Sequence, residues 1–154
     1  MNEQRHPLDL REAAQAGVYR VMRADVPALL ALADEDGIAS HEIDVEGVSG
    51  KLELIARIHA ALHFPDDWGQ NWDALLDGLR DLSWLGDAAP RLLVWRGVDT
   101  LHRRDTELES TLCGVLEDAS SDWADQGIAL WSLLAIEQVP AEFIDPDLAD
   151  STRH

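Results

Sequence analysis

The segment that decides the fold is Asn71-Trp-Asp-Ala-Leu-Leu-Asp-Gly-Leu-Arg-Asp-Leu82, which has the clearest helical periodicity in the chain. At about 100° per residue, its apolar side chains fall within an arc of roughly 120°, the stripe that a surface helix buries against a core. Asn71 precedes this stripe and is a favoured N-cap, so the segment predicts an amphipathic helix over 71–82. The stripe consists of Trp72, Leu75, Leu76, Leu79 and Leu82.

Three aspartates occupy the opposite side of this helix at i, i+4 spacings: Asp73, Asp77 and Asp81. Asp73 lies in the first turn, where the positive end of the helix dipole favours a carboxylate. Asp77 and Asp81 have no such reason to be there. Aspartate is a poorer helix former than glutamate, and each of the two repels the acid one turn earlier by about 0.2–0.5 kcal/mol. The row is either an ordinary solvated face or a surface kept for a partner.

The surroundings of the helix are also acidic. Between Pro65 and Asp87 there are six aspartates, one arginine and no lysine, and Asp66 and Asp67 lie in the preceding loop. Short carboxylates spaced along one helix face are similar in charge and rough geometry to a row of phosphates. A concave, cationic RNA-binding cleft would be complementary to such a row.

Strands and helices alternate along the rest of the chain. Alternation and short apolar runs predict strands at 18–22, 41–45, 91–95 and 128–134. Apolar residues at helical spacing predict helices at 26–33, 51–62 and 108–123. This order favours an α/β domain with a mainly parallel sheet of three to four strands flanked by helices.

Composition narrows the class of protein. The 154 residues include 30 acidic and 12 basic side chains, a net charge of −18, which disfavours binding to nucleic acid or anionic membranes. There is one cysteine, Cys113, and no run approaches the ~18 apolar residues of a membrane span. The first residues lack the apolar core of a secretory signal, so we expect a cytoplasmic protein.

The stretch from Phe64 to Trp84 resembles the signature of the barstar family of small ribonuclease inhibitors, and a looser resemblance extends over 41–134. It implies a barstar-like domain at 39–136, an N-terminal strand–helix addition at 1–38, and an acidic tail at 137–154 that we expect to fray. The residues that match in register are Pro65, Gly69, Asn71, Asp73, Ala74, Leu75, Asp77 and Leu79.

The resemblance implies a mechanism and a set of contact residues. The loop and the helix of family members enter a nuclease cleft, and the central carboxylate that takes the place of a substrate phosphate corresponds to Asp77. Two positions depart from the family, because Asp67 replaces a contacting tyrosine and Leu76 replaces a tryptophan. The implied partner-binding residues are Asp67, Trp68, Asn71, Trp72, Asp73, Leu76, Asp77, Asp81, Trp84 and Glu117.

The sequence therefore predicts an intracellular inhibitor, an antitoxin or immunity protein, that blocks the active site of a basic extracellular or toxin-type ribonuclease. It is expected to be a monomer before binding, to need no cofactor or metal, and to have no enzymatic activity. The alternative is an acidic interaction module of the same fold that binds a basic protein other than a nuclease, since fold does not fix function.

Other functions have weaker signals. His59 and His63 have the i, i+4 spacing of a metal-ligating pair, but no third ligand is indicated. The segment Gly47–Lys51 is too short between its glycines for a phosphate-binding loop. The aspartate row is a candidate Mg²⁺ site, although such sites draw acids from two elements. Six tryptophans without interleaved lysine or arginine do not indicate RNA binding.

Overall fold

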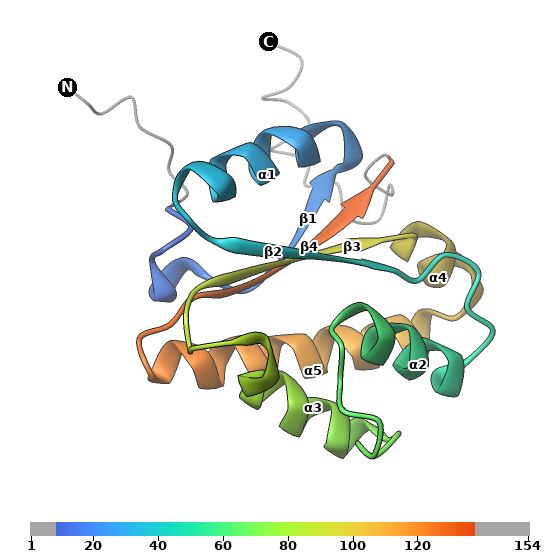
Figure 1. Cartoon of the computed structure of the whole chain (residues 1–154). Helices are drawn as coiled ribbons and strands as arrows, with labels where there is room; N and C mark the ends of the chain where they lie inside the picture. Colours follow the sequence, from blue (N-terminus) through green and yellow to red (C-terminus); the bar gives the residue numbers. More distant parts are fainter. Residues whose placement is uncertain (1–8, 138–154) are drawn as a thin grey trace, which may run out of the picture.

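A four-stranded sheet forms the middle layer of the molecule, and helices cover both of its faces (Figure 1). The structure is a computed structural model and describes residues 9–137. The strands are β1 (Val18–Met22), β2 (Ala39–Asp44), β3 (Arg91–Arg96) and β4 (Leu130–Ile136). All neighbouring strands pair in parallel, in the order β1-β4-β3-β2, so the predicted fold class is confirmed.

The position of each strand explains its sequence pattern. Every residue of β4 is buried, and so is every residue of β3 except Arg96, because both strands are central and covered on two faces. They therefore appear in the sequence as continuous apolar runs. β2 lies at an edge and buries only Ile43, which is why polar and apolar residues alternate there.

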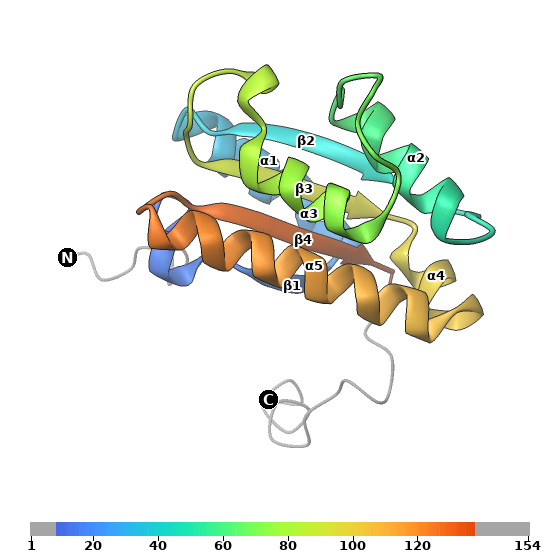
Figure 2. The ribbon, with the colours of Figure 1, turned by 90° about the horizontal axis from the view of Figure 1, so that it is seen from below.

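Five α-helices surround the sheet. They are α1 (Val26–Glu35), α2 (Lys51–Ala61), α3 (Trp72–Asp81), α4 (Val98–Arg104) and α5 (Thr106–Asp125). Figure 2 shows α2, α3 and α5 together on one face of the sheet, with α3 alongside α5. Helix α1 covers the opposite face (Figure 1).

The predicted elements are all present with small shifts of their ends. β2 begins two residues before its predicted start, and β4 begins and ends two residues later than predicted. Helix α4 was not predicted, because seven residues are too few for helical periodicity to be visible. Short 3₁₀ turns at Ala13–Gln15, Arg23–Asp25 and Ser83–Leu85 complete the described elements.

The sheet separates two hydrophobic cores. The larger core lies under α2, α3 and α5 and includes Trp95 and Leu134, while the smaller lies under α1 and includes Trp131 and Leu133. Alternate residues of the central strands supply the two cores, as the two faces of a sheet require. Helix α1 and the turns before it thus close a face that would otherwise expose apolar side chains.

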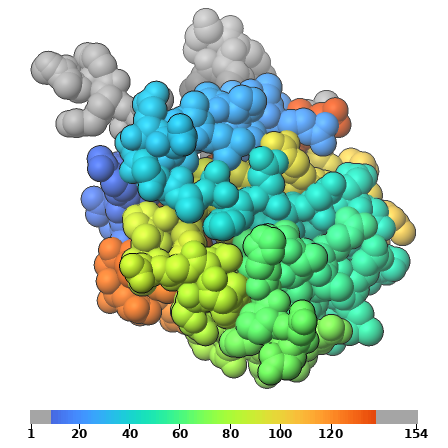
Figure 3. All heavy atoms as spheres, viewed as in Figure 1, coloured from blue at the N-terminus to red at the C-terminus, as the bar shows by residue number. Residues whose placement is uncertain are grey.

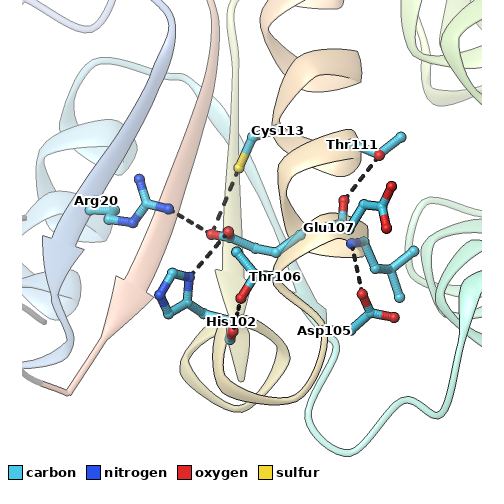
Figure 4. Close-up of polar contacts among 9 residues, drawn as sticks. Arg20, His102, Asp105, Thr106, Glu107, Thr111 and Cys113 are labelled. Atoms are coloured by element: carbon cyan, nitrogen blue, oxygen red, sulfur yellow. Dashed lines mark hydrogen bonds and ion pairs between the residues drawn. The ribbon is translucent and has the colours of Figure 1, made fainter. Parts of the chain in front are cut away.

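Polar contacts also join the N-terminal segment to the rest of the molecule. The Trp131 indole Nε1 donates to the Leu10 carbonyl at 2.7 Å. Arg20 of β1 pairs with Glu109 of α5 at 2.6 Å, and the Glu109 side chain is only 6% exposed. His102 of α4 contacts the other oxygen of this carboxylate at 3.3 Å (Figure 4). One buried carboxylate therefore links β1, α4 and α5.

No helix among residues 9–137 is long and apolar enough to cross a membrane. Of the predicted acidic tail, only Glu137 lies within the described residues, where its backbone N–H donates to Asp99 Oδ2 at 2.8 Å.

Candidate functional site

The start of α3 is fixed by a side-chain cap. Asn71 Oδ1 accepts a hydrogen bond from the Ala74 backbone N–H at 2.8 Å, as a good N-cap does. Leu75 and Leu79 are fully buried, so the predicted apolar stripe faces the core. With that stripe packed inward, the opposite side of α3 is turned to solvent.

The aspartate row lies on this solvent side. Asp73, Asp77 and Asp81 are all exposed, as are Asp66 and Asp67 in the loop before the helix. We call these five residues the acidic surface. Its members lie on two consecutive segments, which Figure 3 shows as the green atoms beside α2.

Most carboxylates of the acidic surface form no ion pair with another residue in the described part of the chain. Asp77 is 68% exposed, and within residues 9–137 its only ion pair is with Arg80 Nη1 at 3.6 Å, a weak pair at the surface. Asp81 Oδ1 accepts from the Ser83 backbone N–H at 3.2 Å, which gives this aspartate a structural role in the turn after α3. Arg80 also pairs with Asp122 of α5. Asp77 therefore has only a weak structural role in the helix.

The predicted aromatic contact residues are mainly structural supports. Trp68 Nε1 donates to the Ala74 carbonyl at 2.7 Å, and Trp84 Nε1 donates to the Leu62 carbonyl at 2.9 Å. Their rings lie 5.2 Å apart and both pack edge-on against Phe64. Both indole side chains are half-buried, so they and the buried Phe64 ring fix the loop against α3 while the indoles keep part of their surface exposed.

Trp72 and Leu76 are also half-buried and pack against the larger core. Each lies on the border between the buried stripe and the aspartate row. The structure thus brings nine of the ten predicted residues onto α3 and its flanking loops: Asp67, Trp68, Asn71, Trp72, Asp73, Leu76, Asp77, Asp81 and Trp84.

Glu117 is not brought to this surface. The flank of α5 that faces α3 is marked by Trp123, whose Nε1 donates to the Leu79 carbonyl at 2.7 Å, and by Asp122, which pairs with Arg80. At about 100° per residue, Glu117 lies roughly 140° from Asp122 around the helix. It lines a hollow with Tyr19 and other residues of the N-terminal segment.

Asp122 is the α5 acid that pairs with α3, and it is not among the residues predicted from the sequence. Exposed Asp118 and half-buried Asp122 form an i, i+4 pair beside the buried stripe of α5, and this spacing was a visible signal. The sequence does not say which flank of α5 faces α3. The contact of Arg80 with Asp122 supplies that information.

The alternative sites are not assembled in the described part of the chain. No group of three or more His, Cys, Asp or Glu side chains within residues 9–137 is placed to hold a metal. The His59 ring stacks on Phe64 with centroids 4.5 Å apart, and His63 is exposed. In the turn before α2, the Ser49 backbone N–H donates to Glu53 Oε1 at 3.0 Å, where a phosphate-binding loop would leave its amides for the ligand.

These features define a small three-layer α/β protein that presents an acidic helix and has no metal centre among its described residues. Residues 38–135 match the family model described as Barstar (barnase inhibitor), and this chain belongs to the barstar family. The members of this family are inhibitors and not enzymes, and the chain is accordingly not an enzyme. No curated protein matches the chain.

Proposed function

We propose that the protein is an inhibitor that blocks the active site of a basic ribonuclease with the acidic surface of α3 and its preceding loop. The observation that carries the proposal is the exposed row of Asp73, Asp77 and Asp81 on a helix held firmly by its cap and its buried stripe. Membership of the barstar family supports a ribonuclease as the partner.

The physical basis is charge complementarity with little reorganisation. A nuclease cleft carries cationic side chains that hold the RNA backbone, and a row of carboxylates on a rigid helix offers them anions at fixed spacing. Asp77 lies at the middle of the row and is the proposed central carboxylate. Asn71 and Asp73 extend the contact toward the loop, and Trp72, Leu76, Trp68 and Trp84 supply apolar surface around it.

The first experiment is a titration of cationic ribonucleases with the full-length protein. We expect RNA cleavage by the cognate enzyme to cease at one equivalent of protein, and association to slow steeply as ionic strength rises. Capture of a basic protein without any loss of RNA cleavage in the panel would favour the alternative, an interaction module with a non-nuclease partner.

The second experiment compares Asp77→Ala with Asp34→Ala. Both changes remove one exposed aspartate, but Asp34 lies on α1, on the other face of the sheet. Truncating one partner of a buried charge pair costs about 2–5 kcal/mol, so Asp77→Ala should raise the inhibition constant by at least about thirtyfold. Equal, small effects of the two variants would remove Asp77 from the proposed site.

A further inference from the structure

A hollow of about 260 Å³ lies between α2 and the loop that leads to α3. His59 and two alanines of α2 form one wall, and Phe64, Pro65, Asp66 and Gln70 form the other. An apolar cavity of about 150 Å³ takes a benzene-sized group, so this hollow has room for the end of a long side chain. It borders the acidic surface, because Asp66 belongs to both.

The lining combines acceptors with apolar walls. Asp66 and Gln70 are exposed residues at the rim, and no hydrogen bond or ion pair is recorded for either side chain within residues 9–137. His59 Nε2 is buried and has no hydrogen-bond partner among the described residues. Phe64 and Pro65 add apolar surface beside these polar groups.

Two further observations give the hollow a fixed shape and a defined charge. The Phe64 ring is held on one side by His59, with ring planes 12° apart, and edge-on by Trp68 and Trp84. Burial lowers the pKa of His59 from its usual value, so the imidazole is uncharged near neutral pH and does not repel a cation. The net charge of the lining is that of the Asp66 carboxylate.

We propose that this hollow is a socket for an arginine side chain of the basic partner, with Asp66 as the carboxylate that receives the guanidinium. A guanidinium is planar, offers several donors in a fixed fork, and pairs with a carboxylate through two parallel hydrogen bonds. The Gln70 amide oxygen accepts a further N–H, and Phe64 and Pro65 cover the methylene stem. The identity of the occupant as part of a partner protein rests on the proposed function, but the affinity of the socket for arginine does not.

The test uses N-acetyl-arginine amide as the probe and the full-length ¹⁵N-labelled protein as the receptor. We expect saturable shifts of the Gln70 side-chain amide and of the His59 and Asp66 backbone amides. N-acetyl-citrulline amide has nearly the same shape without the charge, and it should produce almost no shifts. Equal shifts with the two probes, or shifts spread evenly over the acidic surface, would overturn the socket.

Two matched variants test whether the probe binds in the hollow. Asp66→Asn should weaken probe binding about tenfold, the lower end for a hydrogen bond to a charged group at a partly solvated site. Asp67→Asn removes the same charge from the next residue, which does not line the hollow, and should leave binding of the arginine probe within about twofold, whatever its effect on a nuclease. An equal loss in both variants would mean that general attraction to the loop, and not the socket, holds the probe.

Failure of the socket and failure of the proposed inhibitor function give different results. If the probe binds as expected but no ribonuclease is inhibited, the socket stands and the proposed function fails. If a ribonuclease is inhibited while Asp66→Asn binds both probe and nuclease as the unchanged protein does, the proposed function stands and the socket is wrong.

Discussion

At the scale of single residues, Gly78 shows how tightly the candidate site is built. A Cβ at this position would lie 2.3 Å from Phe64 Cε2 and 3.1 Å from Trp68 Nε1. Phe64 cannot withdraw easily, because it is buried and in contact with His59, Trp68 and Trp84. The absence of a side chain at Gly78 therefore lets the loop lie directly on α3.

Gly78→Ala should destabilise the protein despite the higher helix propensity of alanine. Overpacking costs about 1–3 kcal/mol, while alanine gains about 1 kcal/mol over glycine within a helix, so we expect a net loss of up to about 2 kcal/mol. Gly114→Ala in α5 is the control, because its Cβ would meet no atom within 4 Å and should stabilise the protein. Urea denaturation of both variants measures the difference; stabilisation by both would show that the loop is loosely packed.

Cys113 is predicted to be a slow thiol. Burial, and next the Glu109 carboxylate, raise its pKa from 9.0 to about 11. Near pH 8 this lowers the thiolate population about a hundredfold, and the greater nucleophilicity of a more basic thiolate recovers about tenfold. Alkylation by iodoacetamide should therefore be at least about tenfold slower in the folded protein than in denaturant. Equal rates in the two conditions would contradict the burial of this side chain.

At the scale of elements, a cationic junction forms where β2 begins beside β3. His41 on β2 is half-buried with Nε2 unpartnered among residues 9–137. Arg91 at the start of β3 is buried and donates to the Asp87 carbonyl. Burial first, and then the charges of Arg91 and His63, lower the pKa of His41. The pKa of Arg91 is also lowered by burial.

Because half-buried His41 lies beside buried Arg91, we expect the folded protein to lose stability in mild acid. Because the folded state disfavours protonated His41, the unfolded state binds the proton more readily, and stability rises with pH. The contribution of neutral His41 to the free energy of unfolding is complete above about pH 6.5, and it is lost as the pH falls toward the lowered pKa of His41 in the folded state. Urea denaturation between pH 5.5 and 7.5 should show this slope, with carboxylates still mostly ionised.

His41→Gln should reduce that slope, because glutamine does not titrate. His59 has a pKa lowered by burial in the same direction, so part of the slope should remain until His59→Gln is added. A double variant with the full original slope would show that other groups control the response to pH.

At the scale of the whole molecule, charge opposes the compact state. The net charge of −18 is spread over one small domain, and mutual repulsion of like charges destabilises a folded chain. Few of the described acids have close cationic partners, and those pairs lie mostly at the surface. The two cores on either side of the sheet must supply most of the stability.

Added salt should therefore stabilise the protein. Raising NaCl from about 10 mM to 150 mM shortens the Debye length from about 30 Å to 8 Å and screens this repulsion. We expect the melting temperature to rise by a few degrees, equivalent to about 1 kcal/mol. A parallel series in sucrose of equal osmolarity controls for preferential exclusion, and a flat or falling melting temperature in NaCl would contradict the expectation.

The sequence by itself determined the α/β class, the strands, most of the helices and the exposed aspartate row of α3. These features depend on local periodicity, since the buried stripe of Leu75 and Leu79 fixes where Asp77 must point. The resemblance of the same segment to the barstar family added the expected role of Asp77 as the central carboxylate. Short α4, the exact ends of the helices and strands, and the order of the strands in the sheet were beyond reach at this level.

The tertiary structure decided how neighbouring elements share their surfaces. Packing of α5 against α3 turned Asp122 toward the aspartate row and Glu117 toward β1. Packing of the loops that flank α3 joined the Trp68 indole to the Ala74 carbonyl and the Trp84 indole to the Leu62 carbonyl. The placement of the loop before α3 against α2 formed the hollow beside Asp66. A helical pattern gives the angle of each side chain about its own axis, but the rotation of one helix relative to the next is set by the interlocking of their side chains across the core.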